Sequence, residues 1–289
     1  MLTSNLSIAQ ITGASGFVGS RLAKAMEDGY ELLTPTHGEF DITSLEGVRR
    51  YVQRHRPQCI VHLAAISNTG YCEEHPEESY KVNVLGVENL ARVAAECGCK
   101  LVFFSSDQVY NGNLEMGLLT EELPVAPENH YGRHKLLAEE RALQHCPDCV
   151  ALRATWMYDT RREGMYTHNN FVTNIKEALR QGTSLRFATR EYRGITWVDE
   201  VVRNIPHTLR LPGGVYNFGA ENRLNTYETA LAYLDILKCS TPEKVAIADE
   251  ERFAAHVRNI SISMTKAVEA SNGAIQFADT VEGLRRFEE

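Results

Sequence analysis

The stretch Thr12-Gly13-Ala14-Ser15-Gly16-Phe17-Val18-Gly19 decides the fold of this chain. It follows a short apolar run over residues 8–12, which is typical of a strand, and it opens a helical pattern over residues 17–27. Small residues at this place allow a tight turn, a close approach of the backbone to a pyrophosphate and close packing of helix on strand. The glycine spacing is Gly-x-x-Gly-x-x-Gly and differs from the Gly-x-Gly-x-x-Gly fingerprint of dinucleotide-binding folds. The prediction of a nucleotide site therefore rests on the position of the turn between a strand and a helix.

The same alternation continues outward from this turn through the first half of the chain. Short runs rich in β-forming residues alternate with longer helical patterns, which implies right-handed crossovers and a parallel sheet covered on both faces. The sequence therefore predicts a Rossmann-type α/β fold with a doubly wound parallel sheet. The expected strands are 8–12, 31–34, 59–64, 101–105 and 150–155, and the expected helices are 17–27, 45–55, 77–97 and 131–143.

The alternation breaks after Trp156. No linker rich in proline or glycine separates the two parts of the chain, so we expect a small C-terminal substrate lobe interwoven with the sheet. A helix is expected at 170–181 and short strands at 194–198, 215–218 and 259–262. The expected boundaries are 1–155 plus about 193–220 for the dinucleotide-binding domain, and about 156–192 plus 221–289 for the substrate-binding lobe.

Composition and charge narrow the class of partner. The 289 residues include 30 Lys plus Arg against 38 Asp plus Glu, a net charge of −8, whereas binding of nucleic acid needs a basic surface. No run of about 18 apolar residues is present, and the start, Met1-Leu2-Thr3-Ser4-Asn5, lacks the basic and apolar regions of a signal peptide. We expect a cytoplasmic protein that binds neither nucleic acid nor membrane. Its seven irregularly spaced cysteines fit reduced thiols.

The end of the second expected strand bears on the choice of nucleotide. The usual acid that binds the ribose 2′-hydroxyl is missing from Leu33-Thr34-Pro35-Thr36-His37. A 2′-phosphate is then not repelled, and Thr36 or His37 could contact one, but no arginine stands there to bind it. The sequence therefore favours NADP slightly over NAD and leaves both open. Asp41-Ile42 borders the adenine, or Asp41 caps the next helix, and both interpretations stay open.

Three residues farther along the chain form a candidate catalytic set. Tyr131 and Lys135 are four apart, so they share one face of a helix. A tyrosine with the ordinary pKa of about 10 shuttles protons poorly at neutral pH, and an ammonium beside it should lower that pKa. Ser106 follows the fourth strand, at the carboxyl edge of the sheet where open α/β folds bind ligands. Its hydroxyl could hold a substrate carbonyl beside the phenol.

With these residues the chain resembles the extended short-chain dehydrogenase/reductase family. The motifs that carry the resemblance run over nearly the whole chain and are Gly13-x-x-Gly16-x-x-Gly19, His62-Leu63-Ala64-Ala65, Asn83-Val84-Leu85-Gly86, Ser105-Ser106-Asp107 and Tyr131-Gly132-Arg133-His134-Lys135. The motifs similar to the subgroup that reduces dTDP-4-dehydrorhamnose are Asp41-Ile42-Thr43, Arg153-x-x-Trp156-x-Tyr158, Asn170-Phe171-Val172, Gly194-Ile195-Thr196 and Arg258-Asn259. The resemblance implies that Ser106, Tyr131 and Lys135 are catalytic.

The resemblance also implies where the ligands bind. The chain departs from the subgroup at Gln108, where an aromatic residue is usual, and at Val257, where a proline is usual, and both positions concern the sugar pocket. Arg190 and Arg193 are further candidates for a diphosphate, whose charge an acidic protein must offset locally. The expected substrate contacts are Ser106, Asp107, Trp156 and Arg258. The expected cofactor contacts are Gly13, Ser15, Gly16, Phe17, Val18, Gly19, Thr36, His37, Asp41, Ile42, Ala64, Ala65, Ile66, Asn83, Tyr131 and Lys135.

The activity that the resemblance implies is hydride transfer from NADPH or NADH to a nucleotide-linked 4-keto-deoxysugar. Dehydratases of the family carry an Asp-Glu pair after the strand-end residue, because removing water needs an acid and a base. Here Asp107 is followed by Gln108, whose amide cannot accept a proton usefully. An epimerase of the same family, or a noncatalytic dinucleotide-binding regulatory subunit, stays open as an alternative. The presence of the full catalytic set favours an enzyme, and a homodimer is the family-level expectation.

Two further motifs receive a structural interpretation. Cys146-Pro147-Asp148-Cys149 has the spacing of a redox or zinc pair. It follows a helix instead of preceding one, and Cys97-Gly98-Cys99 has poor ligand spacing, so no metal is expected. Arg161-Arg162-Glu163-Gly164 and His168 form either a solvated loop or a mobile cover over the substrate, and the solvated loop is favoured.

Overall fold

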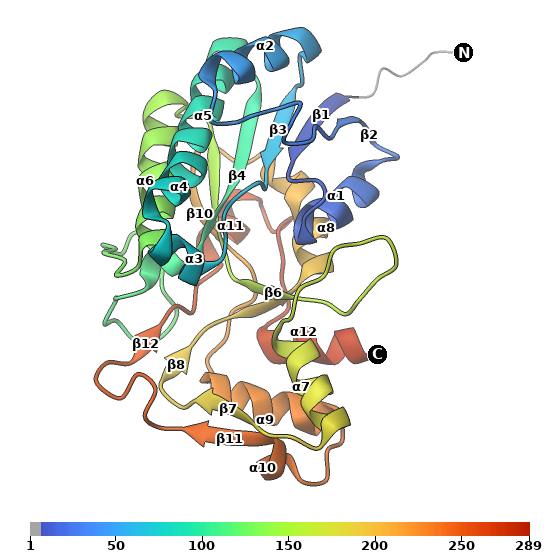
Figure 1. Cartoon of the computed structure of the whole chain (residues 1–289), viewed down its shortest axis with the longest axis vertical. Helices are drawn as coiled ribbons and strands as arrows, with labels where there is room; N and C mark the ends of the chain where they lie inside the picture. The colour runs from blue at the N-terminus through green and yellow to red at the C-terminus, as the bar shows by residue number, and fades with distance from the viewer. Residues whose placement is uncertain (1–6) are drawn as a thin grey trace.

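The computed structural model describes residues 7–289, so the sequence start at residues 1–5 lies outside the described residues. Six parallel strands form the central sheet in the order β10-β5-β4-β3-β1-β2 (Figure 1). This is the predicted Rossmann-type α/β fold. The strands are β1 (Ser7–Thr12), β2 (Tyr30–Leu33), β3 (Cys59–His62), β4 (Lys100–Ser106), β5 (Val150–Ala154) and β10 (Gly214–Phe218).

Helices cover both faces of the sheet because successive strand residues point into two different apolar layers. In β4, Val102 belongs to the layer beneath α1 and α8, whereas Leu101 and Phe103 belong to the layer beneath α2, α5 and α6. Since both faces are covered, a ligand reaches the sheet only at an edge, and the carboxyl edge is the one that this fold uses. The helices are α1 (Phe17–Met26), α2 (Leu45–His55), α5 (Gly86–Cys97), α6 (His130–His145) and α8 (Val198–Thr208).

The helix expected at 77–97 is interrupted. It consists of α4 (Pro76–Tyr80), a π-helical turn η1 (Lys81–Leu85) and α5. Gly86 lies so close to Ile42 that a Cβ atom at this position would lie 2.6 Å from the isoleucine Cδ1. Asn83 in the turn binds the loop after β3. Local π-helical turns are frequent at functional sites, and here the turn places a polar side chain on the loop that borders the sheet edge.

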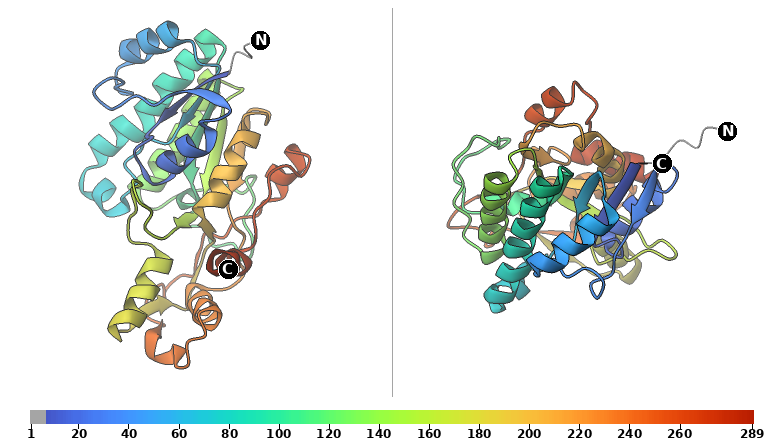
Figure 2. Two further views of the ribbon diagram at one scale, coloured as in Figure 1. Left: turned by 90° about the vertical axis from the view of Figure 1, so that its right-hand side faces the viewer. Right: turned by 90° about the horizontal axis from the view of Figure 1, so that it is seen from above.

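The second part of the chain forms a smaller lobe below the carboxyl edge of the sheet (Figure 2). It has its own apolar cluster, which includes Tyr158, Phe171, Ile175, Tyr233 and Leu284. Its strands pair as β6 with β9, β7 with β11 and β8 with β12, and the strand expected at 259–262 is shorter than predicted. The elements of this lobe are β6 (Trp156–Tyr158), α7 (Phe171–Gln181), β7 (Leu185–Ala188), β8 (Glu191–Tyr192), β9 (Ile195–Trp197), α9 (Thr226–Ile236), α10 (Pro242–Val245), β11 (Ala246–Asp249), β12 (Arg258–Asn259) and α12 (Thr280–Glu288). The helix α11 (Thr265–Ala270) lies apart from them, against β10.

One stretch within the expected substrate-binding lobe packs with the residues of the central sheet. Ile260, Ile262, Ala267 and Ile275 pack in the same apolar cluster as β1 and α8 instead of the cluster of the smaller lobe. We therefore propose that residues 260–275 belong to the dinucleotide-binding unit. None of the helices within residues 7–289 has the length and apolar character needed to cross a bilayer.

Candidate functional site

The glycine-rich turn forms a close-fitting backbone cradle between β1 and α1. Gly13 has a φ of +71°, and a Cβ atom there would lie 2.8 Å from the backbone nitrogen of Ala64. A Cβ atom at Gly19 would collide with the carbonyl oxygen of Gly13. Gly16 caps α1 without a side-chain hydrogen bond, so the first N–H groups of the helix remain available to a ligand. These features fit a dinucleotide pyrophosphate, which binds at such helix starts.

The turn is fixed to the end of β3 by a buried pair. Thr12 Oγ1 lies 2.6 Å from His62 Nδ1, and it accepts weaker hydrogen bonds from the backbone of Leu63 and Ala64 at 3.3 and 3.4 Å. Burial, with a contribution from nearby Lys135, lowers the pKa of His62 to about 3. The imidazole is therefore neutral at physiological pH. Its role is to hold the two strand ends together.

Asn83 acts on the loop after β3 through its amide. Its Oδ1 accepts a hydrogen bond from the backbone N–H of Ile66 at 3.0 Å, and its Nδ2 donates to the carbonyl of Ile66 at 2.9 Å. The side chain is 1% exposed. The amide is thus engaged on both sides, and it shapes the segment Ala64 to Ile66 from below.

The end of β2 carries an acid that the sequence reasoning missed. Glu39 accepts hydrogen bonds from the backbone N–H and the hydroxyl of Thr36, at 2.9 and 2.8 Å, and these bonds lower the pKa of its carboxyl. Its carboxylate is held in the turn after β2, and the end of the second strand is the region where folds of this type bind the adenosine ribose. The sequence analysis missed this acid because it searched only the residues directly after the strand. Glu39 comes several residues later, and a turn brings it back to Thr36.

Asp41 and Ile42 occupy the connection that leads to α2. Asp41 accepts hydrogen bonds from the backbone and hydroxyl of Thr43 at 2.9 and 2.7 Å, whereas Ser44 caps α2 by accepting from the backbone of Gly47. The helix cap expected of Asp41 is therefore supplied by another residue. Ile42 is buried in the layer beneath α2 and α5, so its side chain is part of the core. His37 is exposed.

Ser106 and Tyr131 meet at the carboxyl edge of the sheet. Ser106 ends β4, and Tyr131 lies in the first turn of α6, whose start is capped by Asn129. The phenol is only 8% exposed, and burial raises the pKa of Tyr131, with Asp107 and Cys72 raising it further and the hydrogen bond to Ser106 opposing the rise. The phenol is therefore protonated at neutral pH.

Lys135 lies one turn farther along the same face of α6. Its Nζ donates to the carbonyl of Phe104 at 2.7 Å and is 5.7 Å from the centroid of the Tyr131 ring. Burial lowers the pKa of Lys135 to about 8, and nearby Cys72 and Glu139 oppose this shift. The net shift of the Tyr131 pKa is upward in this structure because burial of the phenol dominates, and the expected lowering by the ammonium stays a prediction.

The lowered pKa of Lys135 predicts a pH dependence. Below about pH 8 the ammonium is charged and can hold a ligand hydroxyl, and above that pH it loses its proton. We expect kcat/KM for the dinucleotide to fall as the pH rises through about 8. Because the pKa of Tyr131 is raised, the phenol does not titrate in the same range. Steady-state kinetics from about pH 6 to about pH 10 at constant ionic strength tests this, and a flat profile would contradict it.

A network of charged side chains joins the end of β4 to the smaller lobe. Arg193 lies 3.4 Å from the carboxylate of Asp107, and its guanidinium is 4.9 Å from the centroid of the Trp156 ring. Its Nε is buried without a hydrogen-bond partner. Asp107 is 2% exposed, and burial raises its pKa, although Arg193 and Arg258 oppose the rise. The Arg190 side chain is exposed, and its backbone carbonyl accepts a hydrogen bond from the backbone N–H of Arg258 at 2.9 Å.

Arg258 forms the other half of the network. It donates to Gln108 Oε1 at 2.8 Å and to Asn111 Oδ1 at 3.1 Å, and it pairs with Glu191. Gln108, where the sequence departs from the subgroup, is therefore a direct partner of Arg258. Glu191 was missed because no motif marks it. The network brings the guanidinium groups of Arg193 and Arg258 to Asp107 and Gln108, the two residues that follow Ser106. Two neighbouring guanidinium groups can hold an anionic ligand.

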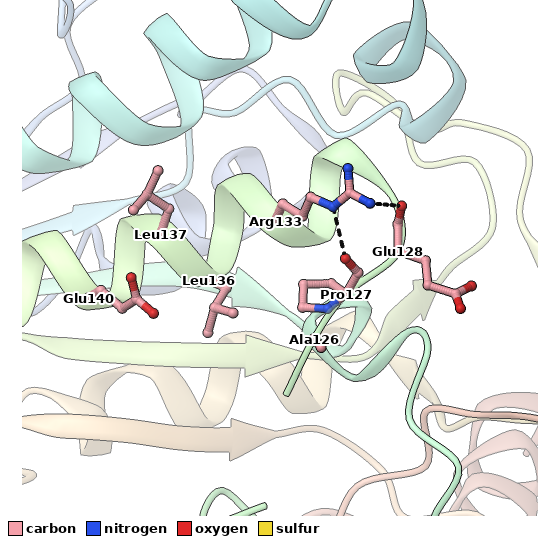
Figure 3. Close-up of a pocket in the computed structure, with 7 residues that line it drawn as sticks. All are labelled: Ala126, Pro127, Glu128, Arg133, Leu136, Leu137 and Glu140. Atoms are coloured by element: carbon pink, nitrogen blue, oxygen red, sulfur yellow. Dashed lines mark hydrogen bonds between the residues drawn. The ribbon is translucent and has the colours of Figure 1, made fainter. Parts of the chain in front are cut away.

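A separate hollow lies on the outer part of α6. Arg133 crosses it and donates to the carbonyls of Pro127 and Glu128 at 3.0 and 2.8 Å (Figure 3). The hollow has a volume of about 410 Å³ and is lined by Ala126, Pro127, Glu128, Arg133, Leu136, Leu137 and Glu140. It contains none of the candidate catalytic residues, so it is distinct from the site at the sheet edge.

Known proteins share this fold and this sequence pattern. The chain is 26% identical over 276 residues to a dTDP-4-dehydrorhamnose reductase of Aggregatibacter actinomycetemcomitans, which covers 90% of this chain and 92% of the relative. It is 25% identical over 226 residues to the spore coat polysaccharide biosynthesis protein SpsK of Bacillus subtilis (strain 168), covering 78% of this chain and 77% of the relative.

The solved structures give the same result for the fold. The crystal structure of dTDP-4-dehydrorhamnose reductase from Bacillus anthracis str. Ames in complex with NADP is similar with a TM-score of 0.83 and 23% identity, over 98% of this chain and 99% of that chain. Residues 9–285 match the family described as the RmlD substrate binding domain, nearly the full length described by the structure. The chain therefore belongs to the RmlD substrate binding domain family.

Proposed function

We propose that the protein is an NAD(P)H-dependent reductase of a nucleotide-linked 4-keto-deoxysugar, of the kind that dTDP-4-dehydrorhamnose represents. The observation that carries the proposal is the meeting of Ser106, Tyr131 and Lys135 at the carboxyl edge of the sheet. The glycine cradle lies at the same edge, where it can hold the dinucleotide. The reductase relatives support the substrate class.

The proposed chemistry follows from the position of each side chain. When bound, the reduced dinucleotide supplies a hydride to the ketone carbon of the sugar. Tyr131 donates the phenol proton to the ketone oxygen, so that the ketone becomes an alcohol. Ser106 holds that oxygen beside the phenol, and Lys135 binds the ribose of the dinucleotide with its ammonium. Fixing the donor and the carbonyl together removes much of the entropic barrier.

Arg193 and Arg258 are proposed to bind the diphosphate of the sugar nucleotide. Both guanidinium groups are largely buried, and each is paired with a carboxylate, Asp107 or Glu191. A diphosphate offers a second anionic partner to the same groups, and the two arginines can bind its oxygens in a bidentate manner. Trp156, against which Arg193 stacks, forms the wall between this anion site and Ser106.

Both NADP and NAD are proposed as cofactors, and Glu39 provides a test of the preference. Its carboxylate, held by Thr36, repels a 2′-phosphate and can bind a 2′-hydroxyl. We expect Glu39→Gln to raise the ratio of kcat/KM for NADPH to that for NADH by about two- to fivefold, the size of an exposed charge interaction. Glu27→Gln, at the far end of α1, removes the same charge elsewhere and serves as the matched control. An unchanged ratio in Glu39→Gln would place the ribose away from this acid.

A direct assay tests the proposed function. Purified protein is mixed with NADPH or NADH and a panel of thymidine- and guanosine-diphosphate 4-keto-deoxysugars, and the loss of the reduced-dinucleotide absorbance is followed. Reduction of a panel member supports the proposal. Conversion of the sugar without net loss of absorbance indicates an epimerase instead. Binding of the dinucleotide without any turnover indicates a regulatory subunit.

The cellular location and the oligomeric state of the protein are also part of the proposal. We propose a cytoplasmic enzyme, because all seven cysteines are free thiols in the structure. A homodimer is proposed on the family resemblance alone. Light scattering of the purified chain measures the oligomeric state, and a monomer at all concentrations would contradict the dimer.

A further inference from the structure

Arg21 makes contacts that are unusual for an arginine on the first helix. It lies one turn after the glycine-rich turn, and its side chain is 2% exposed. Its Nε donates to Asp159 Oδ2 at 2.8 Å. Its two terminal nitrogens donate to the carbonyls of Phe17 and Tyr166 and to the hydroxyl of Thr167, at 2.7, 3.0 and 3.2 Å. One buried guanidinium thus joins α1 to a loop of the smaller lobe.

The loop that Arg21 holds runs from Asp159 to Asn170, between β6 and α7. Its ends are tied together, because Asn170 Nδ2 donates to the carbonyl of Asp159 at 2.8 Å and Asn170 also caps α7. Both ends therefore belong to the smaller lobe, whereas the loop itself projects toward α1 (Figure 1). Compact surface loops with joined ends are frequently functional. The expectation of a solvated loop holds for part of it, because Arg161, Glu163, Gly164, Tyr166 and Asn169 are exposed. The Tyr166 carbonyl, Thr167 and His168 instead contact α1.

A second arginine extends the attachment to α8. Arg162 binds the same carboxylate of Asp159 at 2.8 Å and reaches Asp199, in the first turn of α8, at 2.9 Å. Asp159 is fully buried beneath the two guanidinium groups. The loop is thus connected by charge to both helices on this face of the sheet. Its exposed part, residues 161–165, lines a surface hollow of about 510 Å³.

The docked part of the loop lies against the residue that begins α1. The His168 ring packs edge-to-face on the Phe17 ring with the centroids 4.6 Å apart, and the Arg21 guanidinium stacks on the same ring at 4.4 Å. Phe17 is the first residue of α1, where the free N–H groups face the expected pyrophosphate. The loop is therefore placed beside the cofactor site, although it originates in the substrate lobe.

We propose that residues 160–169 form a clamp over the dinucleotide pyrophosphate and that Arg21 is the positioning residue that holds it there. Residues 166–168 supply the contact surface, and Arg21 fixes them to the start of α1. The inference rests on the proposed dinucleotide binding but not on the sugar substrate. It predicts that loop docking and dinucleotide binding favour one another, because a ligand stabilises the state to which it binds more tightly.

Limited proteolysis reports on the loop directly. Cleavage by trypsin after Arg161 and Arg162 is expected to be faster when the loop leaves α1, because the protease needs an extended segment of free backbone. In the wild-type protein, saturating NADPH is expected to slow cleavage at these two sites by about tenfold, in proportion to the undocked fraction. Mass spectrometry identifies the cleaved bonds, and tryptophan-to-NADPH energy transfer measures the NADPH dissociation constant on the same samples. If NADPH binds but leaves cleavage at these sites unchanged, the clamp is wrong, whereas absence of NADPH binding contradicts the proposed function instead.

Three variants test the role of Arg21. Arg21→Met is expected to raise the NADPH dissociation constant by about tenfold or more, because the docked state becomes a minor one, and to remove the protection from trypsin. Arg21→Lys keeps a positive charge beside Asp159 but cannot make the other contacts of the guanidinium. Its NADPH affinity is therefore expected to lie between those of Arg21→Met and the wild type. His168→Ala, on the partly exposed loop, weakens NADPH binding without disturbing Asp159. It keeps the test valid if Arg21→Met fails to fold.

Arg49→Met is the matched control for the loss of an ion-paired arginine. Arg49 bridges Glu46 and Glu96, on α2 and α5, on the other face of the sheet. The Arg49→Met variant is expected to bind NADPH with the affinity of the wild type and to be protected from trypsin by NADPH in the same way. At saturating NADPH, kcat of Arg21→Lys and His168→Ala is expected to stay within about threefold of the wild type, because the effect lies in KM. NADPH affinity equal to that of the wild type in both of these variants would overturn the proposal.

Discussion

Replacing Tyr131 by phenylalanine is expected to lower kcat by about 10²- to 10⁴-fold, the usual contribution of a positioned general acid. In the proposed mechanism the phenol donates a proton to the ketone oxygen, and it carries that proton at neutral pH. The ring of phenylalanine fills the same buried space. The lost activity therefore measures the missing hydroxyl rather than a cavity. Steady-state assays with NADPH and the accepted sugar nucleotide measure kcat, and stopped-flow assays with the same reactants measure the rate of hydride transfer.

The affinity for NADPH separates a catalytic role from a structural one. We expect the dissociation constant of Tyr131→Phe to stay within about twofold of the wild type, because the glycine cradle and Lys135 are unchanged. Tyr71→Phe is the matched control, since that exposed phenol donates to Glu78 at 2.7 Å and lies outside the catalytic set. Turnover of Tyr131→Phe at the wild-type rate would remove the phenol from the mechanism.

The parts of the site that the sequence predicted depend on short-range order. The glycine turn, the spacing of Tyr131 and Lys135 and the strand-end position of Ser106 are each defined within a few residues. The sheet then brings them together, because parallel strands place their carboxyl ends at one edge. The resemblance to a known family supplied their order along the chain. The structure keeps all of these at the same edge.

The parts that were missed depend on contacts between residues far apart in the chain. In the sequence, Arg21 looks like a charged residue on the exposed face of an ordinary helix. Its partner Asp159 is 138 residues away and is brought to it only by the fold. Glu191 pairs with Arg258 across two short strands, and the sequence predicted only the second of them, at 259–262. The sign of the pKa shift of Tyr131 also needed the structure. Sequence spacing shows which charge is near a phenol but not how deeply the phenol is buried.

A buried ion pair supports the catalytic set from behind. Arg153 in β5 binds both carboxylate oxygens of Glu139 in α6, with Nε and Nη2 at 3.0 and 2.8 Å from Oε1 and Oε2, and it also donates to Tyr110 at 2.9 Å. Both charged side chains are at most 5% exposed. Ser105 donates to the same carboxylate. Glu139 thus ties α6, which carries Tyr131 and Lys135, to the end of β4.

Removal of the Glu139 carboxylate is expected to destabilise the folded protein strongly. Glu139→Ala leaves the Arg153 charge buried without a carboxylate, so we expect a loss of about 3–5 kcal/mol in the free energy of unfolding. Chemical denaturation followed by circular dichroism measures it. The double variant Glu139→Leu/Arg153→Met removes both charges and should recover most of that loss. Equal destabilisation in the single and double variants would contradict this account of the pair.

Removing the Glu139 charge should also change the pH dependence of the enzyme, because it changes the pKa of Lys135. The negative charge of Glu139 opposes the lowering of the Lys135 pKa by burial. In Glu139→Gln, which keeps the shape of the side chain, the pKa of Lys135 should fall below about 8, and the loss of kcat/KM should begin at a lower pH. A purely structural role for Glu139 would lower the amount of folded protein and leave the midpoint of the pH profile unmoved. The midpoint therefore decides whether the buried pair only stabilises α6 or also shifts the pKa of Lys135, the residue proposed to bind the cofactor.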